Sequence, residues 1–473
     1  MSWTEHPHDL SRSGQLLLCI TGEGGTGKTQ IPKALEAALC ILGRKHEIIL
    51  TAPTGAAADN LGGNTYHTSL GINLSYKAAV STRVRRLWAG KTILVIDEMS
   101  MVDLKMLSVI NNQCKVARSL PRSSPELFGG LPIVILMGDF FQFPPVRGPP
   151  LWKRPRYGVD EDAVGRLIWR RFDYVIILDE QMRQSEDPSF RGFLTRTRQA
   201  ALTEDDVVRL NAKAIPSLTH PASEDSTVIV KLNAIRHPIN RIRIENFARL
   251  RSQRIYVFPA IHTRTKSTGQ VNLRLQAHDL LLQPDHSAQI PFPGLLLYTR
   301  DMPTVMLTNA CTPLGQVNAE LFDLDNVYTL CTRPPASVIF KPDRIPQMRF
   351  DHLPPSTMPI FPIERSIAVK GVSVRRKQVP ICPAFCLTDY KIQGSTLSAA
   401  ILDLKNGTTR RGQDSHRKFC SLYVQLSRLR SFQGLHLLEK ITLDDLRFSP
   451  DPDLIMEMDR LRALEAKTLA AWA

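Results

Sequence analysis

The stretch GEGGTGKT, Gly22 to Thr29, decides the fold. It follows the apolar run LLLCI at 16–20 and precedes the helical pattern PKALEAALCIL, the context in which a glycine-rich loop binds phosphate. The glycines let backbone N–H groups surround the β-phosphate, the lysine reaches the β and γ oxygens, and the threonine hydroxyl is a Mg²⁺ ligand. We expect ATP at Gly22, Glu23, Gly24, Gly25, Thr26, Gly27, Lys28 and Thr29, with Mg²⁺ at Thr29.

Length and composition describe a globular chain with an anionic partner. The 473 residues are enough for two or three domains, and no run approaches the roughly eighteen apolar residues that span a bilayer. The net charge of +15 favours a polyanion. Nine Lys and Arg against one acid lie between Lys231 and Lys266, with Phe247, Tyr256 and Phe258 among them. This stretch is either a solvated face or a nucleic-acid surface.

The cysteines and the N-terminus exclude some classes of protein. The 8 cysteines have no CxxC and no zinc-type spacing, so we interpret them as reduced, mostly buried thiols. The first residues, MSWTEHPHDLSRSG, carry two acids and no apolar stretch, which argues against a secretory signal. Localisation stays open between cytosol, nucleus and organelle.

Short apolar runs alternate with helix-length segments in the first half. The runs at 16–20, 46–52, 93–97, 132–139 and 174–180 are typical of a parallel sheet covered on both faces. The fold class is therefore α/β. A second series of strands is predicted at 226–233, 304–309, 383–389, 399–404 and 422–427. A proline-rich stretch at about 291–380 interrupts it as a small β module or long loops, and 453–472 is predicted to be a closing helix.

Polar residues follow two of the predicted strands. Asp97 and Glu98 end ILVIDE, where one carboxylate can hold the Mg²⁺ shell and its neighbour can activate the attacking water. We assign the metal to Asp97 and the general base to Glu98. Gln142, in GDFFQFPPV, either orients water or senses the γ-phosphate, or lies in a turn set by two prolines.

Seven ordered blocks resemble one family, the petite-integration-frequency helicases, which are RecD-related 5′-to-3′ DNA helicases of superfamily one. The blocks are GEGGTGKT, APTGAAADNLGGNTYHTSLGI, VIDEMSMVD, FGGLPIVILMGDFFQFPPV, LDEQMRQSEDPSF, TDYKIQGST and LYVQLSRLRSFQGL. The sub-pattern with LDEQMRQ and VQLSRL is similar to copies common in filamentous fungi, some near Helitron-type transposons.

The resemblance implies two RecA-like domains with parallel sheets, at 1–185 and 186–473. It places a wedge at 147–165, an SH3-like insertion at about 291–380 and a final helix at 451–473. Arg183 and Arg428 match the arginine fingers. The family contacts to single-stranded DNA fall on Thr54, Thr65, His67, Lys391, Gln393 and Thr396, although His67 alone would also suit a core histidine.

The implied function is ATP-driven unwinding of DNA, with family roles in repair, recombination and telomere maintenance. We expect a monomer that acts on single strands and duplex junctions in the nucleus, with the mitochondrion as the alternative location. Three departures favour a competing interpretation, a truncated DNA-binding remnant with little ATPase activity. They are the short lead-in without an adenine-reading glutamine, Ala319 in place of the glycine of VNG, and Phe143 in place of leucine. A small-molecule kinase is the third alternative, and the late blocks disfavour it.

Overall fold

The computed structural model describes residues 14–72, 81–218, 220, 224, 226–264, 278–285, 290–307, 321–324, 327–342, 353–369, 372–405 and 415–472. These residues form two compact units, Met1–Ala214 with Asp389–Ala473, and Ile215–Thr388. The predicted turn Val317–Asn318–Ala319 lies outside the described residues, as does Lys266 at the end of the basic stretch.

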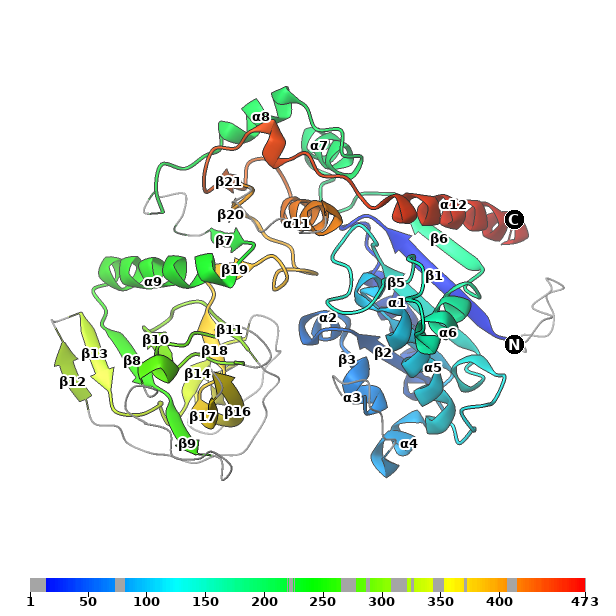
Figure 1. Ribbon diagram of the computed structural model, residues 1–473, viewed down its shortest axis with the longest axis horizontal. Helices are drawn as coiled ribbons and strands as arrows, with labels where there is room; N and C mark the ends of the chain where they lie inside the picture. Colours follow the sequence, from blue (N-terminus) through cyan, green and yellow to red (C-terminus); the bar gives the residue numbers. More distant parts are fainter. Residues whose placement is uncertain are drawn as a thin grey trace. The chain divides into compact units, whose positions relative to one another are not determined.

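A six-stranded parallel sheet is the centre of the first unit (Figure 1). The strand order is β3-β2-β4-β5-β1-β6, so the α/β class and the parallel sheet predicted from the sequence are confirmed. Its strands are β1 (Leu16–Gly22), β2 (Ile48–Ala52), β3 (Asn64–Thr65), β4 (Ile93–Ile96), β5 (Ile133–Gly138) and β6 (Tyr174–Leu178).

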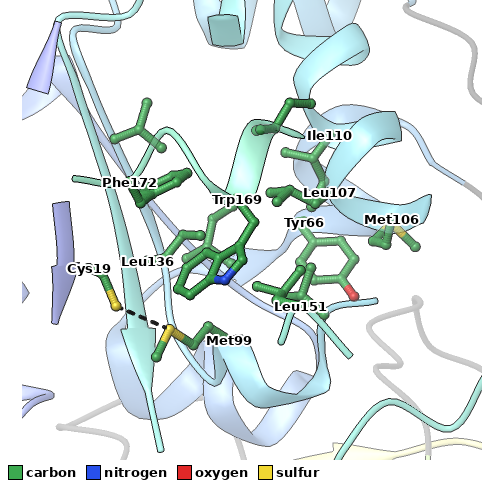
Figure 2. Packing of buried hydrophobic residues seen from close by; sticks show 14 of the residues in the cluster. Cys19, Tyr66, Met99, Met106, Leu107, Ile110, Leu136, Leu151, Trp169 and Phe172 are labelled. Carbon is green, nitrogen blue, oxygen red and sulfur yellow. Dashed lines mark hydrogen bonds between the residues drawn. The ribbon is translucent and has the colours of Figure 1, made fainter. Parts of the chain in front are cut away.

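Alternate residues of these strands enter two separate cores, because successive side chains point to opposite faces of a sheet. Leu18 and Ile20 pack in one core with Leu39 of α1 (Gln30–Ile41). Leu17 and Cys19 pack in the other, with residues of α5 (Leu104–Ala117) and α6 (Asp160–Trp169). Figure 2 shows this second core, in which Trp169 lies near Leu136 and Leu151. The helices are α1 (Gln30–Ile41), α2 (Gly55–Leu61), α3 (Tyr66–Leu70), α4 (Thr82–Trp88), α5 (Leu104–Ala117) and α6 (Asp160–Trp169), with short 3-10 turns at Lys45–Glu47, Met99–Met101 and Leu127–Gly129.

Later parts of the chain complete the first unit. These are α7 (Pro188–Arg198), α8 (Glu204–Asn211), β20 (Ala400–Leu402), α11 (Ser415–Ser427), β21 (Leu435–Leu437), a 3-10 turn at Leu443–Asp445 and α12 (Pro452–Trp472). The predicted closing helix is confirmed, and it covers the edge strand β6 (Figure 1). Thr468 Oγ1 accepts the N–H of Val175 at 3.1 Å, and Glu465 Oε1 accepts the N–H of Ile177 at 2.6 Å. These bonds satisfy backbone donors that an open edge would leave unpaired.

The second unit is mainly antiparallel. It contains β7 (Thr227–Val230), α9 (Asn233–Leu250), β8 (Ile255–Pro259), β9 (Ile261–Arg264), β10 (Leu295–Tyr298), β11 (Thr304–Met306), β12 (Leu321–Leu324), β13 (Tyr328–Cys331), β14 (Val338–Phe340), β15 (Met358–Ile360), β16 (Ile363–Val369), β17 (Val372–Gln378), β18 (Ile381–Pro383) and β19 (Cys386–Thr388). β7 and β19 form a parallel pair. β8 and β9 pair with strands of the predicted proline-rich insertion, so the β-rich part begins upstream of residue 291.

One predicted strand was wrong, and a second is a strand but not part of a parallel series. The run 422–427 is the end of helix α11, all of it buried; an apolar run buried on every side has the same composition in a helix as in a strand. The run 304–309 contains β11, which pairs antiparallel with β18 and so does not extend a parallel series.

The compact units do not coincide with the predicted boundary at residue 185. Residues 186–214 and 389–473 make most of their contacts with the unit that contains the first sheet. A RecA-like domain is defined by strand order instead, so the boundaries 1–185 and 186–473 stay a prediction.

Candidate nucleotide and DNA site

Three neighbouring strands bring the predicted ATP residues to one edge of the sheet. β5 lies between β4 and β1, with Leu136 paired to Ile96 and Gly138 paired to Thr21. Because the strands are parallel, their carboxyl ends lie together. The phosphate loop follows β1, Asp97 and Glu98 follow β4, and Gln142 follows β5.

The phosphate loop has the backbone that its glycines allow. Gly25 and Gly27 have φ values of 103° and 82°, in the left-handed region that favours glycine. A Cβ at Gly25 would lie 2.7 Å from Arg183 Cβ, so a side chain does not fit there. Lys28 Nζ donates to the carbonyls of Gly22 and Glu23 at 2.9 and 2.7 Å, and burial lowers the pKa of this amine. Thr29 caps α1 without a side-chain capping bond.

Asp97 and Glu98 lie side by side after β4. Glu98 has φ 52°, and its N–H donates to Asp97 Oδ1 at 2.8 Å. Burial, and then the charge of Glu98, raises the pKa of Asp97 to about 7. Burial also raises the pKa of Glu98. Both shifts reflect acids held in little water, where a bound cation would favour their charged forms.

Gln142 is buried, and its Oε1 has no hydrogen-bond partner among the described residues. A Cβ at Gly24 would lie 3.1 Å from Arg428 Nη2 and 3.5 Å from Gln142 Nε2. The arginine and the amide therefore converge on the phosphate loop. A buried amide oxygen without a partner is costly unless it meets a ligand or water.

Arg183 and Arg428 meet at Ser427. Arg183 Nη1 donates to the Ser427 carbonyl at 2.6 Å, and Arg428 Nη2 donates to its hydroxyl at 2.8 Å. Burial, and then the neighbouring Arg428, lowers the pKa of Arg183 to about 9. Burial likewise lowers the pKa of Arg428. Both arginines lie in the same compact unit as the phosphate loop.

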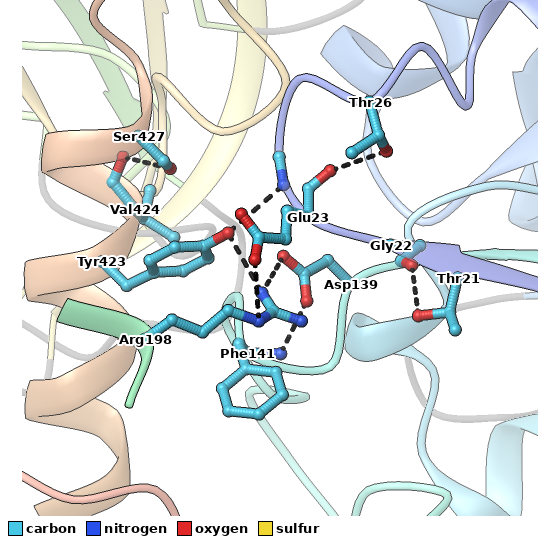
Figure 3. A network of polar contacts seen from close by, with 12 residues as sticks. Thr21, Gly22, Glu23, Thr26, Asp139, Phe141, Arg198, Tyr423, Val424 and Ser427 are labelled. Carbon is cyan, nitrogen blue, oxygen red and sulfur yellow. Dashed lines mark hydrogen bonds and ion pairs between the residues drawn. The ribbon is translucent and has the colours of Figure 1, made fainter. Parts of the chain in front are cut away.

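A buried network behind the phosphate loop was missed by the sequence analysis (Figure 3). Arg198 Nη1 donates to Asp139 Oδ2 at 2.9 Å and to the Tyr423 hydroxyl at 3.0 Å. The same hydroxyl accepts the N–H of Gly24 at 3.3 Å. Arg198 Nε also lies 3.8 Å from Glu23 Oε1. The sequence offered one sign of this network, Asp139 in GDFFQFPPV. A carboxylate at the end of a buried strand needs a cation nearby.

Three cations surround the phosphate loop, of which Arg428 is buried and Lys28 and Arg183 are half-buried. Lys28, Arg183 and Arg428 donate to backbone carbonyls and to one hydroxyl, and within the described parts of the chain none of them forms an ion pair with a carboxylate. Arg198, in contrast, is paired with Asp139. Buried charges without partners are unfavourable, so this arrangement suits a polyanionic ligand.

The predicted DNA residues lie in the first unit but differ in exposure. Thr54 and Thr65 are helix N-caps, whose hydroxyls accept the N–H groups of Ala57 and Thr68 at 3.2 and 3.3 Å. His67 is half-buried, and burial lowers its pKa. The other three residues share the segment 389–396, where Lys391 is half-buried, Gln393 is buried and Thr396 is exposed. Gln393 faces Glu98, to which it donates at 3.0 Å.

Part of the basic stretch is structural, which corrects its interpretation as one continuous surface. Arg236 is 1% exposed and pairs with Asp285 at 2.5 Å. Arg243 is 5% exposed and donates to the carbonyls of Glu224 and Ser226. Arg236 and Arg243 of helix α9 are therefore buried within the second unit. Charge reversal at Arg243 would disturb its packing.

Among the described residues, no group of acids, histidines and cysteines is arranged to hold a metal by itself, and no helix is long and apolar enough to cross a membrane. The described cysteines are free thiols, as predicted, and most of them are buried. Leu151 and Trp152, in the predicted wedge 147–165, pack in the core of the first unit.

The comparisons with known proteins agree with this geometry. Residues 9–192 match the model of the PIF1-like helicases. The resemblance to this family that the sequence blocks carry is supported over this part of the chain. The ATP-dependent DNA helicase PIF1 of Saccharomyces cerevisiae is 30% identical over 251 residues, 51% of this chain and 27% of the relative. Human PIF1, also named an ATP-dependent DNA helicase, is 26% identical over 447 residues, 92% of this chain and 60% of the relative.

A solved structure shares the fold along nearly the whole chain. The Pif1 helicase from Bacteroides, in complex with ADP-AlF3 and single-stranded DNA, matches with a TM-score of 0.59 at 21% identity, covering 96% of this chain and 95% of that one. The match confirms the predicted architecture of two RecA-like domains. The chain spans less than two thirds of the length of the yeast and human relatives.

Proposed function

We propose that this chain is an ATP-dependent DNA helicase that couples ATP hydrolysis to 5′-to-3′ movement on single-stranded DNA and to unwinding of duplex junctions. The observation that carries the proposal is a group of three cations that form no close ion pair with a carboxylate, half-buried Lys28 and Arg183 and buried Arg428, around a phosphate loop at the same sheet edge as Asp97 and Glu98. The 5′-to-3′ polarity rests on the resemblance to the family.

Each residue of the proposed site has a separate role in ATP hydrolysis. Lys28 and the loop N–H groups bind the β- and γ-phosphates, because their bonds to Gly22 and Glu23 can be exchanged for phosphate oxygens. Glu98 accepts the proton of the attacking water, and Gln142 orients that water with its amide oxygen. Arg183 and Arg428 stabilise the charge that develops on the γ-phosphate.

Thr29 and Asp97 suit Mg²⁺, which prefers oxygen ligands and keeps several waters. The Thr29 side chain makes no capping bond, and Asp97 lies among buried groups that favour a cation nearby. When bound, Mg²⁺ neutralises charge on the phosphate oxygens.

For DNA we propose contacts at Thr54, Thr65, His67, Lys391 and Thr396, whereas buried Gln393 faces Glu98. Hydroxyls and an ammonium suit backbone phosphates, so binding should tolerate any sequence and weaken with salt. Arg241, which is exposed on α9, is a further candidate, but buried Arg236 and Arg243 are not. The SH3-like insertion, the wedge at 147–165, the monomeric state, the location in the nucleus or mitochondrion and the roles in repair, recombination and telomere maintenance are parts of the same proposal.

ATP hydrolysis with and without oligo-dT, a single-stranded DNA, tests the proposal. We expect the wild type to be stimulated by DNA, Lys28→Ala to lose nucleotide affinity, and Glu98→Gln to bind nucleotide with turnover reduced by at least about a hundredfold, the scale of general-base catalysis. Leu167→Ala is the control, because this exposed side chain lies on α6, away from the site.

Equal hydrolysis rates for the wild type and Glu98→Gln would refute the assignment. DNA binding without turnover would instead support the DNA-binding remnant, and turnover that DNA does not change would support a small-molecule kinase. The convergence of Arg428 and Gln142 on the phosphate loop supports the helicase over these alternatives.

A further inference from the structure

The segment 389–396 contacts the ATP site at three places, all within the first unit. Gln393 Nε2 donates to Glu98 Oε2 at 3.0 Å. The ring of Tyr390 stacks on Phe143, with centroids 3.9 Å apart and planes at 12°. The carbonyl of Ser395 accepts a bond from Arg428 Nη1 at 3.4 Å. One short segment thus touches the proposed base, the loop that carries Gln142, and an arginine finger.

Gln393 is tightly held against Glu98. The residue is 8% exposed, and its Oε1 has no partner within the described chain. The next residue, Gly394, has φ +79°, and a Cβ there would lie 3.6 Å from Glu98 Oε1. The backbone of the segment therefore passes within van der Waals reach of the Glu98 carboxylate.

Phe143, which departs from the family pattern, belongs to the second contact. It is 1% exposed, whereas Tyr390 is 39% exposed, so the stack runs from the surface to the loop of Gln142. Arg417 supports it by donating to the Tyr390 hydroxyl at 3.4 Å and to the carbonyl of Pro145 at 2.8 Å. An aromatic stack of this kind contributes beyond the area it buries, so the two loops should move together.

We propose that Gln393 is a positioning residue through which DNA binding controls ATP hydrolysis, rather than a residue that contacts DNA. The inference rests on the proposed function. DNA that contacts exposed Thr396 and half-buried Lys391 displaces the short segment, and the amide of Gln393 moves the Glu98 carboxylate with it. The Tyr390–Phe143 stack transmits the same displacement to Gln142.

Proximity alone does not demonstrate coupling, so the test measures coupling directly. Gln393→Met keeps the length and packing of the side chain but removes the donor, and Gln393→Asn keeps the amide but is one methylene too short to reach Glu98. For both variants we measure kcat and KM for ATP without DNA and at saturating oligo-dT, together with DNA affinity. Ser398→Ala, an exposed position beyond the segment, is the matched control.

We expect the ratio of DNA-stimulated to basal kcat to fall by about tenfold in both variants, within the usual range for coupled sites. KM for ATP and the affinity for oligo-dT should stay within about threefold of wild type, because no contact to either ligand is removed. Ser398→Ala should keep the wild-type ratio.

Two results would overturn the inference. One is a DNA affinity weakened about tenfold with normal kcat at saturation, which would make Gln393 a DNA contact. The other is an unchanged stimulation ratio in Gln393→Asn. A wild type that DNA does not stimulate would instead refute the proposed function, so the two failures can be told apart.

Discussion

Replacement of Arg198 by methionine tests the buried network behind the phosphate loop. Asp139 is 0% exposed and the Arg198 side chain 13% exposed, and their bond is 2.9 Å long. Methionine fills much of the arginine volume but leaves the carboxylate unpaired, and breaking a buried pair in this way costs about 3–5 kcal/mol. Arg198 also lies 3.9 Å from the centre of the Phe141 ring, a contact that methionine retains in part.

The pH dependence of this loss has a defined sign. In the wild type, burial raises the pKa of Asp139, but Arg198 and Lys28 outweigh it and the pKa is lowered. This carboxylate therefore stabilises the fold above the unfolded pKa of about 3.9, and the stabilisation is lost as the pH falls through the folded value. In Arg198→Met burial dominates and raises the pKa, so the variant should lose stability as the pH rises above about 4, by up to about 1.4 kcal/mol per pH unit.

Urea unfolding followed by tryptophan fluorescence measures this free energy for the first unit, because the described tryptophans, Trp88, Trp152, Trp169 and Trp472, all belong to it. The remaining tryptophan, Trp3, lies outside the described residues and is replaced by phenylalanine in every variant. Asp139→Asn in the Arg198→Met background should recover much of the loss. Arg191→Met, at an exposed position of the same helix, should stay within about 0.5 kcal/mol of wild type. A loss for Arg198→Met below about 1 kcal/mol, or one that does not change with pH, would refute the buried-pair argument.

Three further outcomes are expected. Gly24→Ala should reduce kcat by about tenfold or more with nucleotide affinity little changed, because its Cβ would lie 3.1 Å from Arg428 Nη2; wild-type kcat would contradict this. Thr468→Val should destabilise the first unit by about 1–2 kcal/mol in urea, since the N–H of Val175 loses its acceptor; a change near zero would mean that water replaces it. Ellman's reagent at pH 8 should label exposed Cys40 quickly and Cys19 only on unfolding, because burial raises the pKa of Cys19 to about 12. Rapid labelling of the Cys40→Ser variant would contradict this expectation. Peptide mapping must first show that the labelled residue is not Cys311, which lies outside the described residues.

Much of the candidate ATP site could be predicted from the sequence because its parts are local. The phosphate loop is a contiguous stretch after a strand, and Asp97 and Glu98 directly end another strand. Parallel strands place their carboxyl ends at one edge whatever the rest of the chain does, so apolar runs followed by polar residues were sufficient evidence. The apolar run 422–427 did not have this property, because burial on all sides removes the periodicity that separates a helix from a strand.

Only the tertiary structure decided which polar groups meet. Arg198 and Tyr423 are 225 residues apart in the chain, and Gln393 and Glu98 are 295 apart. No local pattern distinguishes these side chains from solvated ones, since a guanidinium or an amide has the same preferences until packing removes its water. Arg236 and Arg243 are a second example. The sequence predicts both as surface charges, but the structure buries them against acceptors of the second unit. Sequence determines the chemistry of each group along the chain, and the fold determines which groups lose water together and must therefore pair.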